Sequence, residues 1–189
     1  MKKQTLDCKN PAAWAAMKRQ THREMMRAFA PKRFPKNAGG KPAKKLNGVR
    51  HFRATAIPVK DMRYCTVGDY RELPLKGIPG YWDITCTDLG NWRYNFQILI
   101  HELVEVAITQ HQGIAEPDIV KCDKKWNAKF GDVEGDDEPG FWSKAPYRQA
   151  HTMATSIELA MAAMLDVSWS DYGKAIDKAW KDLRKAGKK

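Results

Sequence analysis

The chain has 189 residues, 43% of them hydrophobic, and its 33 Lys or Arg against 22 Asp or Glu give a formal net charge of +11. This length suits one well-buried core with appendages, and the ordinary hydrophobic content excludes a wholly disordered chain or a fibrous repeat. Charge interrupts every apolar stretch before the roughly 20 residues that a bilayer-spanning helix needs, and the N-terminus lacks a signal-peptide core. The sequence therefore predicts no membrane partner and a cytoplasmic location.

Charge is divided unevenly along the chain. Residues 1–60 hold sixteen Lys or Arg against two acidic residues (+14), residues 61–173 ten against eighteen (−8), and residues 174–189 seven against two (+5). Lys and Arg gain affinity for polyanions by releasing counterions from phosphate groups. The basic ends therefore predict either contacts with DNA or RNA or a solubilising tail. The nucleic-acid interpretation assigns the contacts to Lys32, Arg33, Lys36, Lys41, Lys44 and Lys45.

Three regions follow from composition and periodicity. Asn10 and Pro11 predict the start of an amphipathic helix over residues 11–29, and residues 31–48 form a linker rich in Pro, Gly and Lys. We therefore expect a basic N-terminal helix and linker over residues 1–50. An α+β core over residues 51–168 and a basic amphipathic helix over residues 169–189 would follow.

The core is predicted to begin with short strands. The runs FRATAIPV from residue 52 and MRYCTV from residue 62 are strand-like, and they are punctuated by Pro and Gly. Residues 81–88, YWDITCTD, alternate apolar with polar side chains, which is the period of a half-buried strand. These segments predict a small mixed or antiparallel sheet.

Three helices are predicted after the strands. Residues 92–112 carry a helical pattern that Gly113 is expected to end, and a second long helix is predicted over residues 146–167. Ser168 and Asp171 fit a capping box for a third helix. We therefore predict an α+β fold, in which the sheet packs on the central helix and the second long helix, with helical basic termini.

The segment HELVE at residues 101–105 is the best candidate for chemistry. His101 and Glu105 share a helix face, and Glu102 lies about 100° further round. One imidazole and one carboxylate at this spacing can bind a divalent cation, and an adjacent carboxylate can accept a proton from water, as in the motif H-E-x-x-H. An ordinary solvated helix face is the alternative. His111 is not included, because Ile108 stands where the longer H-E-x-x-H-x-x-G-x-x-H motif needs Gly.

The second long helix offers further ligands. His151, Thr155 and Glu158 form a narrow polar stripe among apolar residues, and residues 149–173 contain no Lys or Arg. Unpaired burial of such groups costs several kcal/mol, so they are expected to have partners. His151 is the predicted third ligand, and Glu158 is predicted to be a fourth ligand or an orienting partner. A buried hydrogen-bond network among the same groups is the alternative.

Several segments carry a resemblance to known proteins. RYCTVGDY (63–70), DLGNWRYNF (88–96), HELVE (101–105), GI (113–114) and APYRQAH (145–151), followed by Glu158, resemble a group of uncharacterised bacteriophage proteins. A strand leading into a helix that bears H-E is also loosely zincin-like. The resemblance implies a phage origin, and hence the cytoplasm of a host bacterium.

The leading hypothesis is a zincin-like, metal-dependent hydrolase of peptide bonds. His101, Glu105 and His151 would bind zinc or another divalent metal, and Glu102 would be the general base. Strand 81–87 would bind an extended peptide or protein substrate along its edge. The alternative is a nucleic-acid-binding accessory protein whose polar core is purely structural. A di-metal carboxylate site is disfavoured, because the usual Glu-x-x-His pairs are absent.

Overall fold

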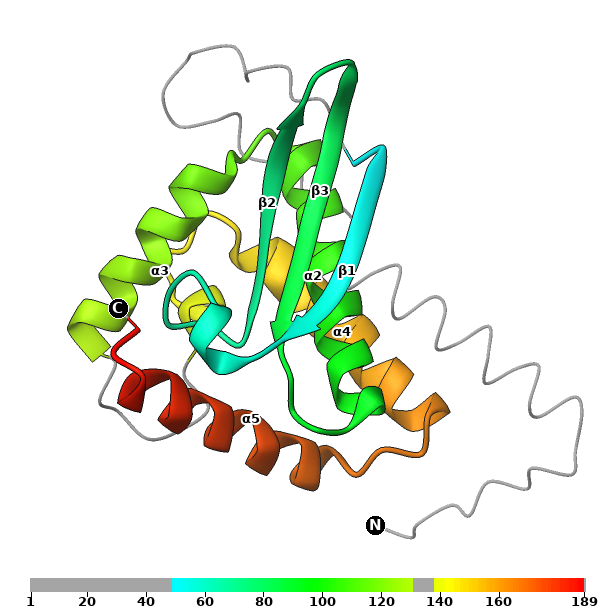
Figure 1. Ribbon diagram of the computed structural model, residues 1–189, viewed down its shortest axis with the longest axis vertical. Coiled ribbons are helices and arrows are strands. Elements are labelled where there is room, and N and C mark those ends of the chain that lie inside the picture. The colour runs from blue at the N-terminus through cyan, green and yellow to red at the C-terminus, as the bar shows by residue number, and fades with distance from the viewer. Residues whose placement is uncertain (1–48, 131–137, 189) are drawn as a thin grey trace, which may run out of the picture. The chain divides into compact units, whose positions relative to one another are not determined.

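The computed structural model describes residues 49–130 and 138–188. The predicted N-terminal helix, most of the linker and the six basic residues assigned to nucleic-acid contacts lie outside the described residues. Figure 1 shows the arrangement of the described helices and strands.

Three strands form one mixed sheet in the order β1–β3–β2 (Figure 1). The strands are β1 (His51–Ile57), β2 (Gly68–Leu75) and β3 (Ile78–Thr87), with β3 parallel to β1 and antiparallel to β2. A two-residue turn joins β2 to β3, and its Gly77 adopts a φ of +79°, which favours glycine. The prediction of an α+β fold with a small mixed sheet is confirmed.

The run at residues 62–67 was predicted to be strand-like, and this is wrong, because β2 begins only at Gly68. The run lacks the alternation of a strand in a sheet. Its apolar side chains instead turn inward and belong to one buried cluster with Tyr172 and Leu183: they are Met62, Cys65 and Val67.

β3 is more buried than its predicted alternation implied, because Asp83 on the face away from the helices is only 3% exposed. The face toward the helices carries Trp82, Ile84 and Cys86, each at most 1% exposed. On the other face, Arg53 from β1 and Arg71 from β2 both bind the Asp83 carboxylate, with Arg53 Nε 2.6 Å from Asp83 Oδ1. Hydrogen bonds from these arginines hold the pKa of Asp83 below its usual range. The two guanidinium groups cover a carboxylate that the alternation placed in solvent.

Helix α2 (Trp92–Gln112) packs across the sheet, and α4 (Arg148–Met164) packs against α2. Asn91 caps α2 by accepting a hydrogen bond from the Arg93 amide, and Gly113 ends it with a φ of +74°. Both long helices are confirmed. Figure 1 shows α2 between the sheet and α4.

Helix α3 (Glu116–Phe130) was not predicted. Its apolar side chains are few, but Ile119, Cys122 and Trp126 are buried at helical spacing. The many Lys and Asp residues of this segment hid that pattern.

Helix α5 (Trp169–Lys185) begins at the predicted cap, where the Ser168 hydroxyl accepts a hydrogen bond from the Asp171 amide. Tyr172 and Leu183 are at most 1% exposed, and they belong to the same apolar cluster as Cys86 of β3. None of the described helices is both long enough and apolar enough to cross a membrane.

Candidate metal centre

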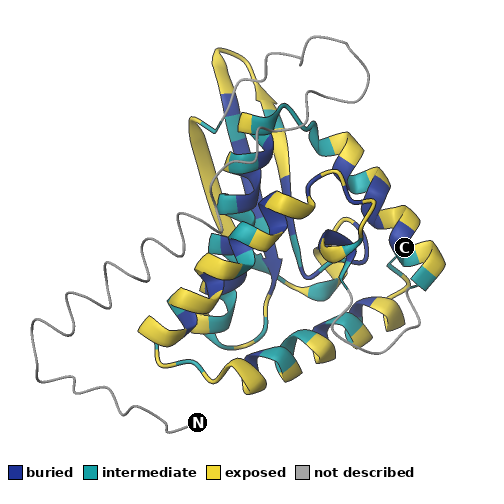
Figure 2. Cartoon of the chain, turned by 180° about the vertical axis from the view of Figure 1, so that it is seen from behind, coloured by how far each residue is buried: buried dark blue, intermediate teal, exposed yellow. Residues whose placement is uncertain are grey.

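The polar arc of α2 is buried, whereas the apolar arc is only partly covered. Four polar side chains follow one another at four-residue intervals, and each is at most 7% exposed: Gln97, His101, Glu105 and Thr109. The apolar side chains of residues 99–100 and 103–104 are only partly buried. Figure 2, coloured by burial, shows α2 and α4 from behind the sheet. The interpretation of the polar arc as an ordinary solvated face is therefore wrong.

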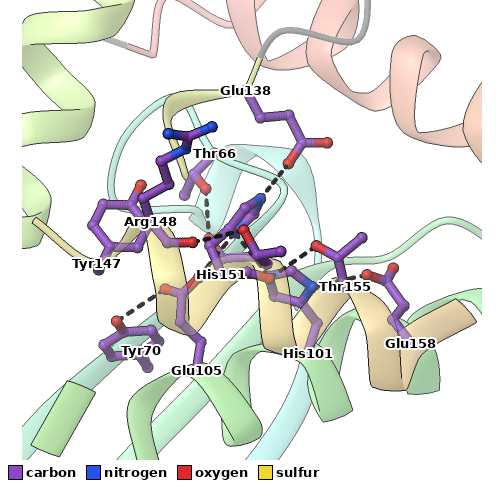
Figure 3. Close-up of polar contacts among 12 residues, drawn as sticks. Thr66, Tyr70, His101, Glu105, Glu138, Tyr147, Arg148, His151, Thr155 and Glu158 are labelled. Carbon is purple, nitrogen blue, oxygen red and sulfur yellow. Dashed lines mark hydrogen bonds and ion pairs between the residues drawn. The ribbon is translucent and has the colours of Figure 1, made fainter. Parts of the chain in front are cut away.

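The polar arc meets His151 of α4, and three potential ligand atoms converge (Figure 3). His101 Nε2 lies 3.1 Å from His151 Nδ1 and 3.5 Å from Glu105 Oε2. The third side of the triangle, from His151 Nδ1 to Glu105 Oε2, measures 2.9 Å. Ligand atoms about 2.0–2.1 Å from a tetrahedral zinc lie roughly 3.3 Å apart. The triangle therefore has approximately the size that a zinc ion requires.

Hydrogen bonds alone satisfy this triangle poorly. If both imidazoles carry a proton on the nitrogen that faces the triangle, His101 Nε2–H and His151 Nδ1–H point at each other across 3.1 Å. If only His101 carries such a proton, on Nε2, the lone pairs of His151 Nδ1 and Glu105 Oε2 face each other across 2.9 Å. If His151 alone carries a proton on the nitrogen facing the triangle, its single Nδ1–H must serve two acceptors, and if neither imidazole does, three lone pairs face one another. A cation at the centre would instead give each of the three lone pairs its own contact.

A carboxylate lies beside the nitrogen of each imidazole that faces away from the triangle, and it is hydrogen-bonded in the case of His101. His101 Nδ1 lies 2.8 Å from Glu158 Oε2, and the Tyr172 hydroxyl donates to the other oxygen of Glu158. His151 Nε2 lies 3.3 Å from Glu138 Oε2, within ion-pair distance but outside hydrogen-bond geometry. Histidines that bind metals almost always donate their second N–H to such a partner.

The carboxylate of the triangle, Glu105, is also held on its outer oxygen. The Tyr70 hydroxyl donates to Glu105 Oε1 over 3.0 Å, which leaves Oε2 for the triangle. Burial favours the neutral acid, but hydrogen bonds from His101 and His151 outweigh it and lower the pKa of Glu105 to about 2. Burial lowers the pKa of a histidine, but Glu105 and Glu138 outweigh this effect and raise the pKa of His151 to about 9. The charges at the triangle are therefore strongly interdependent.

Glu102 lies beside the triangle and is held by close packing. It lines the same cavity as His101 and Glu105. A Cβ at Gly68 would overlap its carboxylate and lie 2.8 Å from Ile98 Cγ2, so only glycine leaves room there. Burial, followed by the charge of Glu105, raises the pKa of Glu102 well above its usual range. A carboxyl with a raised pKa is suited to accepting and returning a proton near neutral pH.

The cavity has a volume of about 570 Å³ and lies between the triangle, α3 and α5. Gly140 borders it, and a Cβ at this position would overlap the His151 ring. The cavity is large enough for a small ligand or for one side chain of a polymer.

The structure brings together His101, Glu105 and His151, and it places Glu158 behind His101 rather than at the triangle. His111 is exposed at the end of α2. Three orienting residues were missed from the sequence: Tyr70, Glu138 and Tyr172. They come from a strand, a loop and a distant helix, and no spacing within one element reveals them.

The predicted binding of a peptide along the edge of strand 81–87 is wrong, because β3 is the central strand and both its edges are paired. The free edge nearest the triangle belongs to β2. The amide of Thr87 donates to Val67, so the antiparallel register directs the carbonyls of Gly68 and Tyr70 outward. Those carbonyls already accept hydrogen bonds from Thr66 Oγ1 (2.5 Å) and Arg63 Nη2 (3.2 Å).

No family model, curated protein or solved structure matches this chain.

Proposed function

We propose that this chain is a zincin-like, metal-dependent hydrolase of peptide bonds, with zinc or another divalent metal held by His101, Glu105 and His151. The observation that carries the proposal is the triangle of three potential ligand atoms, 2.9–3.5 Å apart, with a carboxylate or hydroxyl group behind each of them. A cation held there would polarise a carbonyl oxygen and make a water molecule more acidic.

The remaining chemistry belongs to the chain itself. Glu102 is the general base, because it lines the cavity beside the ligands and burial raises its pKa above that of an ordinary carboxyl. Glu158 and Tyr70 hold the ligands in place. The substrate enters the cavity rather than adding to the sheet, since Arg63 and Thr66 occupy the nearby edge of β2.

Metal analysis of the untagged full chain tests the site. Purified protein should contain about one zinc per chain, and His101→Ala or His151→Ala should reduce this to background. His111→Ala is the matched control, because it removes an exposed histidine from the same helix, and it should keep the metal. Equal metal content in all four proteins would refute the site.

Glu102→Gln separates catalysis from metal binding. The amide keeps the shape of the carboxyl but accepts no proton, so hydrolysis of a casein or peptide-library substrate should fall by about 10²–10⁴-fold while metal content stays constant. If the variant loses its metal, Glu102 is a ligand. Undiminished hydrolysis would exclude it as the base.

A second candidate function, nucleic-acid binding, is favoured by the distribution of charge. The first 60 residues carry +14, while residues 61–173 carry −8. The basic residues at positions 32–45 would then hold DNA or RNA through phosphate contacts. This function is compatible with a hydrolase, because the two would use different parts of the chain.

A further inference from the structure

The cavity is acidic although the chain is basic. Among the described residues, eight Asp or Glu but only two Lys or Arg line it. One divalent cation at the triangle would leave an excess of negative charge. The cavity therefore favours a ligand that carries positive charge of its own.

The acidic residues on the α3 side differ in how they are paired. Arg63 binds Asp69, with its Nε 2.6 Å from Asp69 Oδ2, and it also reaches Glu116 at 2.9 Å. Asp123 is 7% exposed, and within the described residues no Lys or Arg forms an ion pair with it. Lys124 instead directs its ammonium toward the Tyr64 ring, 5.9 Å from its centroid.

Asp123 is held by two tyrosines. The Tyr64 hydroxyl donates to Oδ2 over 3.2 Å, and the Tyr147 hydroxyl donates to Oδ1. An ionised carboxylate can accept about four hydrogen bonds, so two donors leave capacity for a cationic group. Burial raises the pKa of Asp123 to about 7, and a cation beside it would favour the ionised form.

The surroundings of Asp123 also suit a cation. Tyr64, Trp126 and Tyr147 line the cavity around it, and aromatic faces attract ammonium and guanidinium groups. The Tyr147 ring lies 6.2 Å from the His151 ring, while its hydroxyl reaches Asp123. Tyr147 therefore contacts both His151, at one corner of the triangle, and Asp123.

We propose that Asp123 is a specificity residue that binds an ammonium or guanidinium side chain of the substrate. The inference rests on the proposed hydrolase. It specifies that hydrolase as one whose substrate is a peptide with Lys or Arg close to the scissile bond. Asp123 and His151 line the same cavity and both contact Tyr147, so a long basic side chain would reach Asp123 while its backbone lies near His151.

Calorimetric binding of two small probes to the full chain tests the proposal. Nα-acetyl-lysine methylamide and Nα-acetyl-norleucine methylamide share a backbone and a similar side-chain length, and only the first carries an ammonium. At pH 8 the lysine probe should bind about tenfold or more tightly, as expected for a buried charged hydrogen bond. Equal affinities for wild-type protein would overturn the proposal, whether or not any variant folds.

Two variants locate the preference. Asp123→Asn should abolish the discrimination between the probes while keeping the affinity for norleucine. Asp177→Asn, which removes another carboxylate from the cavity wall, should keep the discrimination. If the preference survives Asp123→Asn in folded protein, or disappears with Asp177→Asn, a different group binds the cation and the proposal is wrong.

The test also separates this inference from the hydrolase. Binding is measured with metal-free and zinc-loaded protein, so a lysine preference without any hydrolysis supports the cation subsite and counts against the enzyme. Hydrolysis of a peptide library with no enrichment of Lys or Arg around the cleaved bond would overturn the subsite and leave the enzyme standing.

Discussion

At the scale of single residues, Glu158 is the clearest case in which geometry separates a ligand from an orienting group. Its Oε2 lies 2.8 Å from His101 Nδ1, while His101 Nε2 faces the triangle. Glu158→Gln should therefore weaken zinc affinity by about 10–100-fold but leave a stoichiometry of one, as measured by competition with a chromogenic chelator. Glu105→Gln, which removes a charged ligand, should instead abolish stoichiometric binding. Matching losses in the two variants would make Glu158 a ligand.

The protonation of His151 predicts a pH dependence of metal binding. Its pKa is raised to about 9, so the metal-free imidazole is protonated below that pH and must release a proton before its nitrogen can bind metal. Zinc affinity should therefore rise by about tenfold per pH unit for each histidine proton released between pH 6 and 8, and the contribution of His151 should level off above about pH 9. The pKa of Glu105, about 2, means that this carboxylate releases no proton in the range. An affinity that is constant from pH 6 to 8 would contradict the assignment.

At the scale of elements, the contact of β2 with α2 depends on a glycine. A side chain at Gly68 would displace the Glu102 carboxylate and press on Ile98. Gly68→Ala should lower stability by about 1–3 kcal/mol and reduce hydrolysis, while the metal is retained because no ligand moves directly. Gly173→Ala on α5 is the control, because its Cβ would meet nothing within 4 Å. The control should be neutral or stabilise by up to about 1 kcal/mol, as read by thermal melts. Equal effects of the two substitutions would show that the β2–α2 contact imposes no constraint.

The elements also show what the sequence could and could not predict. The helix from Trp92 to Gln112 and the cap at Ser168 follow from local signals, namely periodicity, Gly113 and a hydroxyl before a helix. Which arc of α2 is buried did not follow, because the polar arc is stabilised by partners on α4, about fifty residues away in the chain. For the same reason the spacing suggested His101, Glu105 and His151 but gave no indication of Glu138 or Tyr172. Strand order likewise depends on long-range pairing.

At the scale of the whole molecule, the basic arm, which is the N-terminal helix and linker predicted over residues 1–50, predicts salt-dependent binding to polyanions. Replacing Lys32, Arg33, Lys36, Lys41, Lys44 and Lys45 with Gln in the full chain should weaken binding to a random DNA duplex. The slope of log affinity against log salt should become shallower by as much as about five, since each phosphate contact contributes about 0.9. The control replaces Lys121 and Lys125, exposed residues of α3, and should leave the slope nearly unchanged. A slope unaffected by the six replacements would make the arm a solubilising tail.

The order of strands has a consequence for how the protein is made. Of the three strands in the described part of the chain, β3 is the last to leave the ribosome, yet it is the middle strand of the sheet, and β1 and β2 each pair with it and not with each other. Until residues 78–87 emerge, neither earlier strand has its native partner, so the sheet cannot assemble one strand at a time. The nascent chain must keep two unpaired strands from associating with other chains during this interval. The charged side chains of β1 and β2 and Pro74 in β2 oppose such association before the sheet closes.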